Sequence, residues 1–169
     1  WPEEVKLEGG ASYVETGLET VGLNHELTFM VQRTSDSTED QILFESAYGS
    51  IKAVQGTTGK VGITRENFNY SFDYELPVGE WVELTIKNSF EVVSLYVNGE
   101  LVDTLGDDEQ VAGRPMLATC MLPVAKIGSE TNAFEGSVKD ATIKAEDPRN
   151  TPNYDGYDLP TAGTTLTAG

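Results

Sequence analysis

The side chains able to do nucleophilic or metal chemistry are few and isolated in this sequence. The chain has one histidine, His25, and one cysteine, Cys120. A catalytic thiol or hydroxyl needs a neighbouring base, and a zinc site needs three or four ligands. Cys120 lies in the apolar run Met116 to Leu122, which favours a small buried side chain. We therefore expect no thiol, serine or zinc catalysis from these residues.

Aromatic and polar side chains alternate in the segment Phe68 to Glu75. The even positions carry the rings of Phe68, Tyr70, Phe72 and Tyr74, and the odd positions carry Asn69, Ser71, Asp73 and Glu75. Sugar binding uses an aromatic ring together with planar polar groups, so the rings could form a binding platform. Several exposed rings on one strand would favour aggregation. We therefore expect the rings to fill the core and their polar neighbours to line an open sheet face.

Ligand contacts are better sought on loops and strand ends. Tyr48 stands at the tip of an expected hairpin, and Arg65, Glu66 and Asn67 come just before the aromatic segment. A guanidinium can bind a sugar hydroxyl or the carboxylate of an acidic sugar, so Arg33 is a further candidate for ligand binding. The predicted ligand-binding residues are Tyr48, Arg65, Asn67, Arg33 and Asp73.

Charge excludes two classes of partner. The chain of 169 residues has 28 acidic and 11 basic side chains, a formal net charge of −17. Such a field repels phosphate backbones and anionic membrane surfaces, so we expect no nucleic-acid partner. No apolar run approaches the roughly 18 residues of a membrane span, so we expect no membrane insertion. The chain opens at Trp1-Pro2 without a signal peptide, which suggests a segment of a longer protein.

The elements that would position these residues are short strands. Apolar runs separated by turn signals recur about every 8 to 12 residues, and 17 glycines supply the turns. Asn98-Gly99 between two apolar runs predicts a type I′ hairpin, because both turn positions need positive φ. Residues 1–146 suit one domain, and the Pro-, Thr- and Gly-rich residues 147–169 indicate a linker or tail. The expected strands are 5–7, 12–16, 26–33, 41–46, 50–55, 60–64, 81–87, 92–97, 126–128 and 136–145.

Three stretches together resemble a known superfamily. They are Leu76 to Ile86, Ser94 to Val102, and Ile127 to Ser129 followed by Phe134 to Ile143. In that order and spacing they resemble the concanavalin A-like, laminin G-like proteins over about Val5 to Ala145. The likeness is nearest to the accessory domains beside bacterial β-N-acetylhexosaminidases and related host-glycan hydrolases.

The resemblance implies an all-β fold, a two-sheet antiparallel jelly-roll sandwich. Trp81 and Tyr96 would then be inward rings that build the core between the sheets. Gly136 would let the last strand approach its neighbour closely.

The resemblance also bears on metal binding, since many members of the superfamily hold a structural Ca²⁺. It implies calcium as the one possible cofactor, with Asp140 and Asp36 as candidate ligands. Lys139 departs from the family pattern, because an acidic residue is common at that position.

Relatives with this fold that hydrolyse glycosides carry two Glu and one Asp alternating on one strand. Asp73 and Glu75 alternate correctly but lack a third member, while Glu39, Asp40 and Glu45 have the wrong spacing. The resemblance therefore implies a non-catalytic carbohydrate-binding module of a secreted bacterial glycoside hydrolase. Its expected partners are a host or mucin-type glycan and the neighbouring domains of the parent protein. The alternatives are a structural spacer or interface domain, and an adhesin-type protein-binding domain without a sugar ligand.

Overall fold

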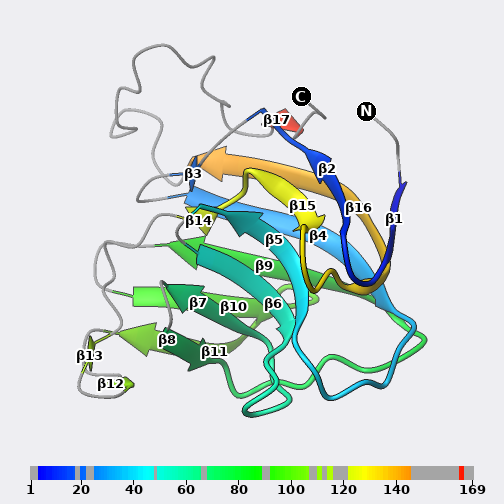
Figure 1. The fold of residues 1–169 in the computed structure, drawn as a ribbon. Coiled ribbons are helices and arrows are strands. Elements are labelled where there is room, and N and C mark those ends of the chain that lie inside the picture. Colours follow the sequence, from blue (N-terminus) through cyan, green and yellow to red (C-terminus); the bar gives the residue numbers. More distant parts are fainter. Residues whose placement is uncertain are drawn as a thin grey trace.

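The computed structural model of the chain describes residues 4–17, 20–21, 25–47, 49–65, 68–88, 92–106, 110–111, 114–115, 122–145 and 164–165. In these segments every regular element is a β-strand, and most of the strands form two large antiparallel sheets stacked face to face (Figure 1). The same residues contain no helix long and apolar enough to cross a membrane. The expected two-sheet, all-β sandwich is confirmed.

The seven-stranded sheet has the order β1-β16-β4-β9-β10-β11, with β17 paired to β16. Its strands are β1 (Glu4–Glu8), β16 (Glu135–Ala145), β4 (His25–Arg33), β9 (Trp81–Asn88), β10 (Val92–Val97), β11 (Glu100–Gly106) and β17 (Thr164–Thr165). β17 lies within the predicted tail and pairs with Thr142 and Ile143, so part of that segment runs beside the sandwich. The division of the chain at residue 146 stays a prediction.

The six-stranded sheet has the order β2-β15-β5-β6-β7-β8. Its strands are β2 (Ser12–Glu15), β15 (Lys126–Ser129), β5 (Gln41–Ser46), β6 (Gly49–Val54), β7 (Gly62–Arg65) and β8 (Phe68–Ser71). Two small sheets pair β3 (Thr20–Val21) with β14 (Leu122–Pro123), and β12 (Gln110–Val111) with β13 (Arg114–Pro115). The chain passes repeatedly from one large sheet to the other, so neighbouring strands often come from distant parts of the sequence.

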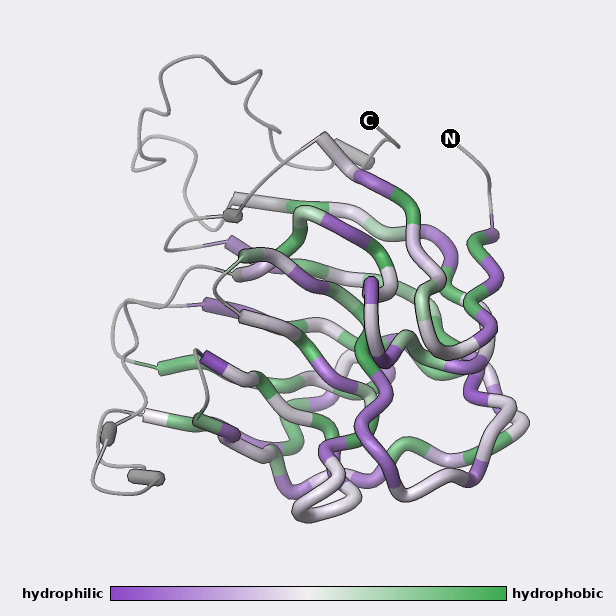
Figure 2. The backbone as a smooth tube through the Cα atoms, viewed as in Figure 1, coloured by the Kyte–Doolittle hydropathy of each residue, from purple (hydrophilic) through white to green (hydrophobic). Residues whose placement is uncertain are grey.

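The core lies between the two large sheets and follows the two-residue period of the strands. In β4 every second residue is buried, and Leu27, Phe29 and Val31 are at most 1% exposed. Phe29 meets Phe44 of the opposite sheet with ring centroids 5.0 Å apart and planes inclined by 64°. Figure 2 shows the result, with apolar and hydrophilic residues alternating along the strands.

The aromatic segment follows the expected alternation, although β8 ends at Ser71. Tyr70 is 2% exposed and Phe72 is fully buried, whereas Asp73 and Glu75 face solvent. The rings therefore belong to the core, and the alternative of an exposed ring platform is wrong for Tyr70 and Phe72.

The predicted core positions of Trp81 and Tyr96 are wrong. In β9 the core side is taken by Val82, Leu84 and Ile86, so Trp81 falls on the outer side and is only partly buried. The ammonium of Lys139 lies 4.2 Å from the centre of the Trp81 ring. Tyr96 is also partly exposed, because the preceding Leu95 takes the inward position. Strand alternation decides the burial of these rings, and their size does not.

Candidate ligand-binding face

The outer surface of the six-stranded sheet carries a row of polar side chains, which we call the polar face. The register aligns one residue from each strand across the sheet: Glu15, Lys126, Glu45, Ser50, Thr64 and Asn69. The adjacent row points the other way into the core and is apolar: Val14, Ile127, Phe44, Ile51, Ile63 and Tyr70. Because successive side chains alternate between faces, the buried row fixes the polar row on the outside.

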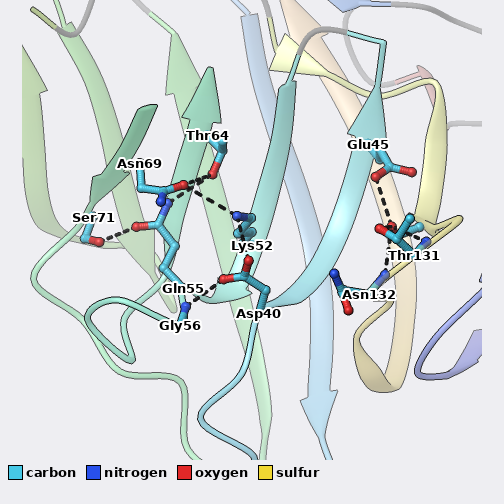
Figure 3. A network of polar contacts seen from close by, with 11 residues as sticks. Asp40, Glu45, Lys52, Gln55, Gly56, Thr64, Asn69, Ser71, Thr131 and Asn132 are labelled. Carbon is cyan, nitrogen blue, oxygen red and sulfur yellow. Dashed lines mark hydrogen bonds and ion pairs between the residues drawn. The ribbon is translucent and has the colours of Figure 1, made fainter. Parts of the chain in front are cut away.

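Lys52 stands on the floor of the polar face. Its side chain is 8% exposed, and its Nζ lies 3.2 Å from Oδ2 of Asp40, whose side chain is 38% exposed. The same Nζ donates to Oδ1 of Asn69 at 3.5 Å (Figure 3). Asp40 is itself held, because its Oδ1 accepts the Gly56 N–H at 2.7 Å. A buried ammonium needs such hydrogen-bonding partners, and these contacts hold the Lys52 side chain in a fixed place.

Amide and hydroxyl groups continue the network beside Lys52. Gln55 Nε2 donates to Thr64 Oγ1 at 3.4 Å, and Thr64 Oγ1 donates to Asn69 Oδ1 at 2.6 Å. The Ser71 hydroxyl donates to Gln55 Oε1 (Figure 3). The Gln55 side chain lies over Gly62, where any Cβ would collide with it. Glycine at position 62 thus gives Gln55 room to lie across the strand.

Glu45 and Tyr13 also lie on the polar face. The Glu45 carboxylate accepts from the Ser129 hydroxyl at 2.9 Å and from the Glu130 N–H at 3.0 Å. Tyr13 on the edge strand β2 is 41% exposed, and Lys126 Nζ lies 5.5 Å from its ring centre. The polar face therefore combines a row of hydrogen-bonding groups with one accessible ring, and this combination suits a polyhydroxylated ligand.

Of the five predicted ligand residues, the structure describes Arg65, Arg33 and Asp73. Tyr48 and Asn67, with Glu66, lie outside the described residues. Arg65 shares the side of the sheet that holds Ile63 and Phe68, which is the side opposite the polar face.

Arg33 makes hydrogen bonds to the backbone, and its predicted ligand contact stays a prediction. It is 9% exposed and donates to the backbone carbonyls of Ser35 at 2.7 Å, Leu76 at 2.8 Å and Ser37 at 3.0 Å. These bonds join the end of β4 to the loop before β5 and to the segment before β9.

Asp73 forms an ion pair with Lys60 at the protein surface. Its Oδ1 accepts from Lys60 Nζ at 2.7 Å, and this contact holds the pKa of Asp73 below its usual value and raises the pKa of Lys60. Its backbone N–H donates to Asp103 Oδ2 at 2.8 Å.

The two predicted calcium ligands are both exposed. Asp36 lies in the loop after β4, and Asp140 has φ 54° in the irregular pairing of β16 with β4. Among the residues with described positions, no three His, Cys, Asp or Glu side chains form a group that could hold a metal ion. A calcium site that uses either aspartate stays a prediction.

Sequence reasoning missed Lys52, Gln55 and Tyr13. One signal was available, because Lys52 interrupts an otherwise apolar strand between Ile51 and Ala53. A charged residue at such a position calls for a partner on the same sheet face. Its partner Asp40 was considered only among the carboxylates whose spacing does not suit a glycoside hydrolase.

The fold defines the class of structure: a β-sandwich with the jelly-roll fold also seen in lectins and carbohydrate-binding modules. A SAP-like pentraxin from Limulus polyphemus is similar at 11% identity and TM-score 0.59, over 83% of this chain and 75% of the pentraxin. Domain 4 of AbnA, an extracellular GH43 arabinanase from Geobacillus stearothermophilus solved with arabinotriose, is 16% identical over 83% of this chain and 80% of that domain, with TM-score 0.54.

The CBM40 of a Ruminococcus gnavus IT-sialidase, solved with α2,3-sialyllactose, is 18% identical over 86% of this chain and 91% of that module, with TM-score 0.55. At these identities the likeness shows the fold alone. No protein-family model and no curated protein matches the chain. The expected lectin-type fold is confirmed, and the likeness to hexosaminidase accessory domains stays a prediction.

Proposed function

We propose that this chain is a non-catalytic carbohydrate-binding module and that its polar face binds a glycan. The observation that carries the proposal is the polar row that crosses all six strands and ends beside the exposed ring of Tyr13. A sugar presents hydroxyls at its edge and C–H groups on its faces, so it matches a hydrogen-bonding floor with a stacking ring. The solved relatives from the arabinanase and the sialidase add support, since each was solved with an oligosaccharide.

The proposal places the module in a secreted bacterial glycoside hydrolase, where it would hold the enzyme at a host glycan. Binding of modest affinity suffices there, because tethering raises the local concentration of the catalytic domain. The carboxylates of the polar face support a binding role rather than hydrolysis. Asp40 is engaged by Lys52 and Gly56, and both oxygens of Glu45 accept hydrogen bonds.

A glycan array, followed by calorimetry on the best-bound oligosaccharide, tests the proposal. Tyr13→Ala removes the accessible ring and is expected to weaken binding about tenfold, a loss of about 1.4 kcal/mol. Tyr96→Ala is the matched control, because Tyr96 is a partly exposed ring on the outer side of the other sheet. Its affinity for the glycan should equal that of the unaltered chain.

Two results would contradict the proposal. Absence of binding to every glycan would favour the spacer or interface role, and equal losses in the two tyrosine variants would exclude the polar face. The array is run with calcium and again with EDTA, because we also propose a structural Ca²⁺ for this domain. A fall in thermal stability with EDTA would support the proposed structural Ca²⁺, and an unchanged melting curve would contradict it.

A further inference from the structure

Acidic side chains outnumber basic ones on the polar face. Lys52 is paired with Asp40, and Lys126 lies over the Tyr13 ring with Glu15 and Glu45 as its partners in register. Two ammonium groups thus face three carboxylates, in a chain whose formal net charge is −17. An anionic group placed on this face would approach Asp40 and Glu45, and Lys52 is already paired with Asp40. The electrostatics of the face therefore disfavour an acidic ligand.

We infer that the ligand is an uncharged sugar and that Lys52 and Asp40 together bind two neighbouring hydroxyls of one ring. This inference rests on the proposed function and names its ligand class. Lys52 Nζ and Asp40 Oδ2 are 3.2 Å apart, a spacing comparable to that of adjacent hydroxyl oxygens on a sugar ring. A vicinal diol can then donate one O–H to the carboxylate while its second oxygen accepts from the ammonium.

Hydrogen-bonding capacity remains at both groups. An ammonium has three N–H donors, and Lys52 uses them toward Asp40 and Asn69, which leaves one donor. Gly56 occupies Oδ1 of Asp40, while Oδ2 keeps a lone pair beyond its contact with Lys52. Asp40 is 38% exposed at its side chain, so it is the rim of this subsite and Lys52 is its floor.

Both groups are fixed before any ligand arrives. Lys52 is enclosed by the sheet and held by Asp40 and Asn69, and Asp40 is held by Gly56. Binding then costs little side-chain entropy. The Lys60–Asp73 pair offers the same chemistry without this support, because its side chains are 36% and 81% exposed. It serves as the matched control pair.

The test compares neutral and acidic glycans on one array, including arabinotriose, lactose and α2,3-sialyllactose, and then measures the best neutral binder by calorimetry. We expect the bound glycans to be uncharged and their affinity to be nearly independent of NaCl concentration. Lys52→Met is expected to lose about tenfold or more in affinity. Lys60→Met should bind as tightly as the unaltered chain.

Asp40→Asn tests the charge argument without removing a hydrogen-bond acceptor for Gly56. It should weaken binding of the neutral glycan several-fold and reduce the discrimination against sialyllactose, because Lys52 then lacks a carboxylate partner. A melting curve checks the fold of each variant, and Asp40→Asn keeps the test decisive if Lys52→Met is unstable.

Preference of the unaltered chain for acidic glycans would overturn the inference. So would full affinity in both Lys52→Met and Asp40→Asn while Tyr13→Ala loses binding, and in that case the proposed function would stand. Failure to bind any glycan would overturn the proposed function and this inference together.

Discussion

At the residue scale, the Lys60–Asp73 ion pair changes the pKa values of its two side chains but contributes little to the stability of the fold. Lys60 and Asp73 form a surface ion pair, and their hydrogen bond is the main cause of the lowered pKa of Asp73 and the raised pKa of Lys60. Asp73 therefore favours the folded state at pH values above its unfolded pKa, and this contribution is lost as the pH falls through its folded value. Lys60 favours it below its own unfolded pKa and loses this contribution as the pH rises through its folded value.

Lys60→Met is predicted to return the pKa of Asp73 upward, toward the value of a free aspartate. NMR titration of the Asp73 carboxyl in the variant and in the unaltered chain measures this. The free energy of unfolding near neutral pH should change little, because exposed ion pairs contribute little. An unchanged Asp73 titration would show that the ion pair does not form in solution.

At the element scale, two glycine-dependent features shape the strands. The Asn98-Gly99 turn has φ values of 51° and 85°, as a type I′ hairpin requires, and Asn98 also accepts the Glu83 N–H at 3.0 Å. Gly136 brings β16 against β4, since a Cβ there would collide with the Gln32 carbonyl oxygen and lie 2.6 Å from the Phe134 ring. The expected close approach at Gly136 is therefore present.

Gly136→Ala is predicted to lower the free energy of unfolding by about 3 kcal/mol, because backbone on the neighbouring strand cannot move aside. Gly10→Ala is the control, since φ is 55° there but no atom lies within 4 Å of the added Cβ. It should cost about 1 to 2 kcal/mol from backbone strain alone. Chemical denaturation measures both variants, and equal losses would contradict the steric explanation.

At the scale of the whole molecule, the two large sheets are joined by rings from each side. Phe29 comes from the seven-stranded sheet and Phe44 from the six-stranded sheet, and both are at most 1% exposed. Their edge-to-face contact is an interaction beyond the burial of each ring alone.

A double-mutant cycle with Phe29→Leu and Phe44→Leu is predicted to give a coupling energy of about 0.5 to 1.5 kcal/mol. The cycle of Phe29→Leu with Phe72→Leu should give about 0.5 kcal/mol or less, because no ring contact joins that pair. Equal coupling in both cycles would mean that general loosening of the core, and not the ring contact, is measured.

The sequence by itself determined the local structure of this protein. Strand periodicity predicted the class of fold, the strand Gln41–Ser46 and the burial of Tyr70 and Phe72, because alternation is a property of neighbouring residues. Asn98-Gly99 predicted its turn for the same reason, since positive φ is a local requirement.

The tertiary structure alone decided which strands are neighbours and what each face carries. Glu15 and Lys126 are far apart in sequence and adjacent on the polar face, while Lys52 meets Asn69 across β7. Trp81 and Tyr96 were expected in the core from the family resemblance, and the register of β9 and β10 placed them outside it. Pairing between strands depends on the burial gained by the whole sandwich, and that total is not contained in any local pattern.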